Sequence, residues 1–389
     1  MNISVVPGLE KLAERVEMIT DSVLRERDQL GLSVPERFNV QVRYFGSRYT
    51  AEASFSHHRP TIRVNAIPLV MPVFDTDGAR ALHRLTEYFG YVREGFGDVP
   101  DETILSIMED SSLIDRLESS MSQVDLASLE KRFAHRGVAY GDLKEILVKT
   151  APLALGILRN TSRKLDQAVD ETDLSVLRHE MDHVDLFRAP FARVYQAYWG
   201  HARRAQRSWE ERGDEESAKA LAAAKMGLLK KMIVVDPVFE TRALFFDQVP
   251  VGGWRDADYD AARDTVLESY RTHYIDDVRL AEMVDALVSR AWSEGRMDQK
   301  TSSFIFSSAN AQSQDSRSHS LYAPDETGVD RAEAERILHE ELPLWKAAMF
   351  DHAADAATVF ADAYRNDPRR LRRAMAAVDV REYLDACRS

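Results

Sequence analysis

The chain has 389 residues, of which 44% are hydrophobic and 30% charged, so it is long enough to form a sizeable core divided among two or three lobes. Its formal net charge of -13 argues against nucleic acid as a partner, because binding to phosphate draws on a basic surface. The single cysteine, Cys387, excludes an internal disulfide and suits a cytoplasmic protein.

The N-terminal region has no signal-peptide pattern, because residues 1–18 lack a basic segment followed by a long apolar one. Residues 9–29 instead carry apolar side chains at helical spacing, which predicts an amphipathic helix. The longest apolar run of the chain, 151–158, is too short to cross a bilayer and is better explained as part of a core helix. We therefore expect a cytoplasmic protein with no membrane partner.

Three β-rich segments follow the first helix, at 38–45, 49–56 and 61–64, and turn residues separate them. They predict a small, mostly antiparallel sheet. Segment 49–56 is the candidate edge strand, and His57 and His58 at its end are expected in a solvated turn.

The most informative stretch runs from Asp170 to Ala189, where apolar residues recur at helical spacing. Asp170 stands ahead of the helix as a candidate N-cap, and Pro190 marks its expected end. Within this helix lie His179, Glu180 and His183, in the pattern H-E-x-x-H.

The spacing of this motif suits a zinc site. Residues i and i+4 of a helix share one face, so His179 and His183 can present imidazole nitrogens to a single Zn²⁺. Glu180 can then reach a water molecule that the metal holds and take its proton. The pattern therefore predicts metal-assisted hydrolysis, with Glu180 as the catalytic base.

The motif helix resembles that of the zincin metallopeptidases, which have the same order of two histidines and a glutamate. Asp182 and Asp185 depart from that family, which generally has uncharged or apolar residues at these positions, and they argue against tight burial of this helix face. The tetrad H-E-M-D-H is also similar to the motif of peptide deformylases. Those enzymes take a third ligand from a cysteine upstream of the helix, whereas Cys387 lies far downstream.

A catalytic zinc site needs a third protein ligand that leaves one position open. Segments 191–212 and 215–235 predict a helical hairpin, and Asp236-Pro237 gives a strong start signal for a further short helix. In zincins whose third ligand is glutamate, that residue lies on a later helix, often as E-x-x-A. Glu240 matches this pattern, so the resemblance implies Glu240 as third ligand. Asp247 lies two turns beyond Glu240 on the same helix face, so it is a candidate hydrogen-bond acceptor for a liganding histidine.

The C-terminal third is predicted to be helical at 256–294 and 330–387, with a long loop or linker between them from Ser302 to Thr327. His273 and Tyr274 are of the types that zincins use to stabilise an oxyanion, although an ordinary amphipathic helix is the favoured explanation for them. The basic cluster 369–373 is expected on a solvated helix.

We therefore expect a mostly helical α+β fold with a zincin-like core, in four regions: 1–74 with the small antiparallel-rich sheet, a helical insertion at 75–165, the metal-binding core at 166–253, and a helical region at 254–389. The expected function is zinc-dependent hydrolysis of a peptide or protein substrate. The alternative is a helical interaction or scaffold protein in which the motif is fortuitous or degenerate. The sequence does not indicate an oligomeric state.

Overall fold

The fold is described from a computed structural model of the chain. The residues described are 1–44, 49–56, 59–83, 85–86, 127, 130–131, 133–134, 140–158, 160–248, 258–312 and 326–389. The chain divides into two compact units, the first formed by 1–129 and 140–187 and the second by 130–139 and 188–389. No helix in the described part of the chain is both long and apolar enough to span a membrane.

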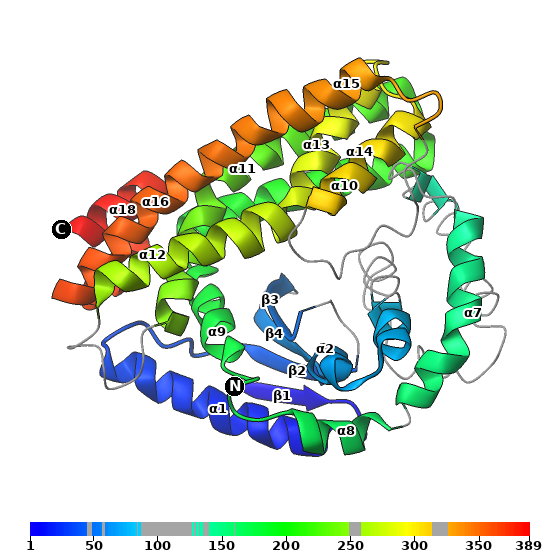
Figure 1. The fold of residues 1–389 in the computed structure, drawn as a ribbon. Helices are drawn as coiled ribbons and strands as arrows, with labels where there is room; N and C mark the ends of the chain where they lie inside the picture. The colour runs from blue at the N-terminus through cyan, green and yellow to red at the C-terminus, as the bar shows by residue number, and fades with distance from the viewer. Residues whose placement is uncertain are drawn as a thin grey trace. The chain divides into compact units, whose positions relative to one another are not determined.

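The first unit contains a four-stranded sheet, drawn in blue in Figure 1. The prediction of an antiparallel-rich sheet is wrong, because only the β3–β4 pairing is antiparallel, whereas β1–β2 and β2–β4 are parallel. A helix of 20 residues separates the first two strands, and such a crossover allows parallel pairing that a short hairpin cannot make. In spatial order the strands are β1 (Asn2–Val5), β2 (Asn39–Arg43), β4 (Arg59–Asn65) and β3 (Ala51–Ser56).

The sheet core consists of the β-branched residues Val40, Val42, Ile62 and Val64, which are at most 1% exposed. Helix α1 (Glu10–Gln29) confirms the predicted amphipathic helix and packs on the sheet through β1 and on helix α9. The predicted edge strand is confirmed, since β3 ends the strand order and, among the described strands, pairs with β4 alone. His57 and His58 lie outside the described residues.

The remaining described helices of the first unit follow the sheet. Helix α7 includes the apolar run 151–158, in which Ala154 is buried and Leu153 is exposed, so the run belongs to a partly exposed helix. Most of the predicted insertion, including residues 87–126, lies outside the described part. The helices of the first unit that follow β4 include α2 (Ala66–Val70), η1 (Met71–Val73), α7 (Tyr140–Leu158), α8 (Thr161–Ala168) and α9 (Val176–Leu186).

The second unit is helical in its described part, and the predicted hairpin is confirmed. Helix α10 (Pro190–Arg212) and helix α11 (Glu215–Gln248) pack together, and Gly213 between them adopts a left-handed conformation with φ 64°. The predicted new helix at Asp236 is wrong, because α11 continues through Pro237. Residues 235–246 are all buried, and this packing outweighs the one backbone hydrogen bond that proline cannot donate.

The C-terminal helices confirm the helical prediction, but residues 302–312 do not form the predicted loop. Helix α14 (Gln299–Gln312) covers them, with Asp298 accepting a hydrogen bond from the Thr301 amide. Residues 313–325 and the boundary at 250–253 lie outside the described residues. The other elements are α12 (Tyr259–Ser269), the π-helix η2 (Tyr270–Val278), α13 (Arg279–Ser293), α15 (Arg331–Glu335), η3 (Arg336–Glu341), α16 (Leu342–Asn366), α17 (Arg369–Arg373), η4 (Ala374–Ala376) and α18 (Val380–Arg388).

Candidate metal centre

Helix α9 carries the H-E-x-x-H motif in the first unit, and it begins later than predicted. Asp170 does not cap it, because Val176 is the first helical residue. Asp170 and Asp173 instead close the preceding turn, each accepting a hydrogen bond from the backbone amide of the other. Every residue from His179 to Leu186 is buried, so the motif belongs to the interior and not to a surface helix.

The two motif histidines face one another. Their Nε2 atoms lie 2.9 Å apart, and the ring planes meet at 81° with centroids separated by 4.6 Å. Two nitrogens bound tetrahedrally to one zinc ion at roughly 2.0–2.1 Å would lie ~3.3 Å apart. The imidazoles of His179 and His183 are therefore arranged closely enough to share one ion, as the helical spacing predicts.

The carboxylate of Glu180 lies against the edge of the sheet. It accepts a hydrogen bond of 2.5 Å from the backbone amide of Ala53 on β3. Since β3 pairs with β4 on its other side, this amide points to the open edge of the strand. The candidate base is thus held beside the strand edge and next in sequence to the first histidine.

Asp182 and Asp185, which argued against burial of this helix face, are fully buried. The guanidinium of Arg27 on α1 explains this, because it donates to Asp182 at 2.8 Å and to Asp185 at 2.9 Å with all three side chains 0% exposed. Ser33 also donates to Asp185 at 2.6 Å. The expectation of an exposed face is therefore wrong, since a buried carboxylate is tolerated when it is paired and hydrogen-bonded.

A second ion pair joins the same two helices. Arg178 on α9 lies 2.6 Å from Glu26 on α1, and Glu26 is 6% exposed. Burial raises the pKa of Glu26, although the positive charge of Arg178 opposes this shift. The C-terminal end of α1 therefore anchors α9 through two neighbouring charged contacts.

Glu240 lies on α11 in the second unit and is buried beside other charged groups. Its Oε1 atom accepts a hydrogen bond of 3.2 Å from Arg279. The same guanidinium lies 2.6 Å from Asp236, one turn before Glu240, and 3.4 Å from Glu282. Asp236, which the sequence indicated as a helix cap, is instead a buried partner of Arg279.

Burial shifts the pKa values of two groups beside Arg279. Burial raises the pKa of Asp236, and Arg279 opposes the shift while Glu240 adds to it. Tyr270 donates a hydrogen bond of 3.2 Å to Asp236, and its own pKa is raised by burial and by the charge of Asp236. One guanidinium thus contacts three carboxylates, those of Asp236, Glu240 and Glu282.

The sequence interpretation missed Arg27, Arg279 and Tyr270. No local pattern identifies them, because they are far from the motif along the chain. The only available signal was the unexplained acidic character of positions 182 and 185 on a helix that otherwise looked buried. Two carboxylates on a buried helix require positively charged or hydrogen-bonding partners from elsewhere in the fold.

The remaining candidates are placed as follows. Asp247 is half-buried in the last turn of α11. His273 is exposed on η2, and the ring of Tyr274 stacks on Tyr270 with centroids 5.8 Å apart. Cys387 is buried in α18, and burial raises the pKa of its thiol to about 11. A metal-binding thiolate is disfavoured by such a pKa, which argues against a deformylase-like cysteine ligand.

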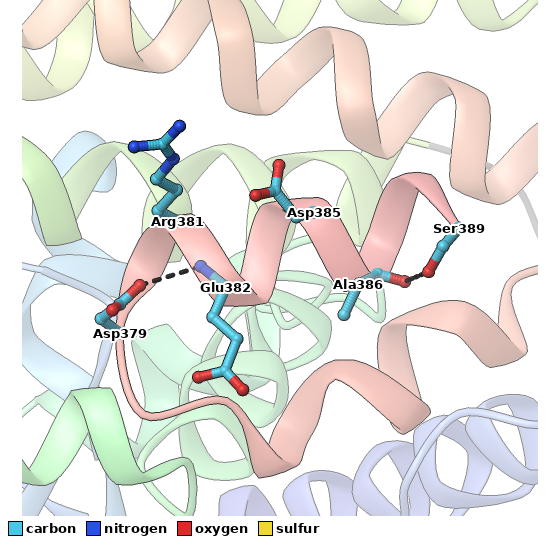
Figure 2. Close-up of a pocket in the computed structure, with 6 residues that line it drawn as sticks. All are labelled: Asp379, Arg381, Glu382, Asp385, Ala386 and Ser389. Carbon is cyan, nitrogen blue, oxygen red and sulfur yellow. Dashed lines mark hydrogen bonds between the residues drawn. The ribbon is translucent and has the colours of Figure 1, made fainter.

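His179, His183 and Glu240 are buried residues of types that together could hold a metal ion. A surface pocket elsewhere, shown in Figure 2, does not resemble such a site. It runs along α18, and Asp379 within it serves as a helix cap that accepts from the Glu382 amide at 2.8 Å. Its lining residues are Asp379, Arg381, Glu382, Asp385, Ala386 and Ser389.

The chain matches no known protein-family model, no curated protein and no solved structure. The features that indicate a metal centre are therefore the motif and the local geometry within each unit.

Proposed function

We propose that the chain is a zinc-dependent hydrolase of the metallopeptidase type, with His179, His183 and Glu240 as metal ligands and Glu180 as catalytic base. The observation that carries the proposal is the pair of Nε2 atoms 2.9 Å apart on α9, with Glu180 directly beside them. Two imidazoles and one carboxylate are a ligand set that catalytic zinc sites use.

The charges and burial of the residues fit such an ion. Glu240 belongs to a group of three carboxylates within 3.4 Å of the Arg279 guanidinium, and the negative charges of this group would attract a divalent cation bound to Glu240. Both histidines are less than 10% exposed, so little water competes with a metal ion for their ring nitrogens. When bound, zinc acts as a Lewis acid that polarises a carbonyl and lowers the pKa of water.

Glu180 supplies the proton transfers in this proposal. Its carboxylate takes a proton from the attacking water and delivers it to the leaving amine nitrogen as the amide bond breaks. The hydrogen bond from the Ala53 amide orients this carboxylate and prevents it from turning freely. His179, Glu180 and His183 all lie on α9, so the same helix fixes the base and both histidines.

The edge strand supports a peptide as substrate. An extended peptide can bind to the free edge of a sheet by adding a strand, which places its backbone along that edge. The amide of Ala53 lies on the open side of β3, and Glu180 bonds to it there. Because Glu180 takes up the Ala53 amide, a peptide would pair with the other outward-facing backbone groups of β3, and one of its amide bonds would then lie beside the proposed base.

The proposal is tested by metal content together with hydrolysis of a mixed peptide library. Purification without added zinc should give about one zinc per chain in the wild type and in Glu180→Gln. His183→Ala should lose the metal, whereas the exposed His201→Ala serves as a matched histidine control that keeps it. Glu180→Gln should reduce the rate of hydrolysis by roughly 10² to 10⁴-fold, the usual contribution of a general base.

Two results would contradict the proposal. A wild-type protein that binds no zinc even after dialysis against it would leave a helical interaction protein as the better interpretation. A zinc-loaded protein whose hydrolysis survives Glu180→Gln undiminished would retain the metal site but exclude Glu180 as base.

A further inference from the structure

We propose that Arg279 is the positioning residue for Glu240, and that the π-helical register of η2 allows both Arg279 and Tyr270 to bond to Asp236. This inference rests on the proposed function, because it assigns to Arg279 the task of orienting a metal ligand. All the residues that carry it belong to the second unit and to contacts within it.

The contacts show a guanidinium that bridges two carboxylates one helical turn apart. Arg279 lies 2.6 Å from Asp236 Oδ1 and donates to Glu240 Oε1 at 3.2 Å. Arginine suits this arrangement because its planar group presents several donors in a fixed fork, whereas lysine offers a single point charge. The side chains of Asp236 and Glu240 are only 2% and 7% exposed, so water competes little for these bonds.

The register of η2 explains how its first residue, Tyr270, and the residue directly after it, Arg279, reach the same target. Tyr270 and Arg279 bound this segment and both bond to Asp236, Tyr270 through Oδ2 and Arg279 through Oδ1. In an α-helix, residues nine positions apart point ~180° away from one another. In a π-helix of roughly 4.4 residues per turn, the same residues lie within ~20° of one face. A regular α-helix would therefore turn one of the two side chains away from Asp236.

The hydrogen bond from Arg279 affects how Glu240 can bind a metal ion. A guanidinium bonded to Oε1 opposes coordination of one metal by both oxygens, so it favours a single metal–oxygen bond. It also limits rotation of the carboxylate, and groups that orient a ligand in this way usually matter for affinity. Tyr270 assists by fixing Asp236, which in turn holds Arg279.

The positive charge of Arg279 can also act against zinc binding, and the experiment must separate this effect from positioning of Glu240. A positive group beside a ligand repels a cation, so Arg279 would weaken zinc binding if it merely competed for Glu240. If it positions the carboxylate, its removal weakens zinc binding instead. The sign of the change in zinc affinity therefore separates positioning from competition.

The test measures zinc affinity by competition with a chromophoric chelator in Arg279→Met, Arg279→Lys and Tyr270→Phe. Arg279→Met should bind zinc roughly 10 to 100-fold more weakly, as expected for loss of a group that orients a ligand. Arg279→Lys should be intermediate, because it keeps the charge but not the fork. The matched control is Arg271→Met, which removes an arginine of the same π-helix that pairs with Glu268 at 2.5 Å on the surface and should leave the affinity unchanged.

A spectroscopic measurement adds a criterion that general loss of stability would not meet. The cobalt-substituted wild type and Arg279→Lys should differ in their visible absorption, because the coordination of Glu240 changes, whereas Arg271→Met should match the wild type. Unchanged or tighter zinc binding in Arg279→Met would overturn the inference and leave the proposed function intact. If Arg279→Met does not fold, unchanged affinity in both Arg279→Lys and Tyr270→Phe would overturn it equally. Absence of zinc binding in the wild type would instead remove the proposed function.

Discussion

Helices α9 and α11 both hold buried carboxylates, but the solvent exposure and the charged partners of the two pairs differ. Each buries two carboxylates about one turn apart on a single guanidinium from another helix, Arg27 in the first unit and Arg279 in the second. Around Arg27 the side chains are 0% exposed and Ser33 adds a further hydrogen bond. Arg279 is 17% exposed and serves a third carboxylate, Glu282, as well.

This difference between the Arg27 and Arg279 networks indicates that guanidinium–carboxylate contacts have different roles in the two units. The side chains of the Arg27 network are inaccessible to solvent, and its aspartates lie on either side of His183, so this network fixes the position of α9. The Arg279 network includes a third carboxylate, Glu282, and the proposed ligand Glu240, so we expect it to respond to a bound cation. We expect the first network to determine the stability of the fold and the second to respond to metal.

The largest effect is expected where the first network is broken. Arg27→Met leaves Asp182 and Asp185 buried without their guanidinium, which should lower the free energy of unfolding by about 3 to 5 kcal/mol. Urea denaturation of the metal-free protein measures this loss. A decrease below about 1 kcal/mol, the value typical of an exposed ion pair, would show that this network does not anchor α9.

Metal addition tests the second network. Zinc at a free concentration of 100 times its dissociation constant should raise the free energy of unfolding by about 2.7 kcal/mol, because it binds the folded chain alone. Glu240→Gln should lose most of this gain. Thermal unfolding with and without zinc provides the comparison, and an equal gain in Glu240→Gln would exclude Glu240 from the site.

A smaller disturbance of the first network comes from Ser33. Ser33→Ala removes a hydroxyl that donates to Asp185, and hydrogen bonds to charged groups contribute about 1.5 to 3 kcal/mol. The variant should retain its zinc affinity if Arg27 is the main anchor. Denaturation and zinc titration of the same sample check both statements, and a larger loss than in Arg27→Met would reverse the ranking of the two groups.

A surface carboxylate gives the reference for these buried ones. Asp298 caps α14, and hydrogen bonds from the side chain and the amide of Thr301 lower its pKa. Asp298→Ala should cost about 1 kcal/mol at pH 7, a typical value for a helix cap. Because the folded pKa is lowered, the contribution is present above the unfolded value of about 3.9 and is lost as pH falls through the folded pKa. Denaturation at pH 7 and pH 3 should show the cost shrinking, whereas a cost independent of pH would contradict the charged cap.

Local patterns in the sequence determined much of the secondary structure and the outline of the site. Helical spacing of apolar residues predicted α1, and Gly213 marked the turn of the α10–α11 hairpin. The spacing of His179 and His183 predicted that their rings would share one helix face. These features follow from short-range geometry, since a period of 3.6 residues or a left-handed glycine acts within a few positions of the chain.

Only the tertiary structure decided the features that join distant residues. Packing of residues 235–246 carried α11 through Pro237, and the crossover helix allowed parallel strands. Arg27 stabilises Asp182 and Asp185 in the interior, although it lies 155 and 158 positions away from them in the sequence. Arg279 reached Asp236 and Glu240 through a π-helix that no composition signal indicated. The physical reason is that a buried charge is stabilised by whichever partner the fold brings within hydrogen-bond distance, and sequence separation does not record that distance.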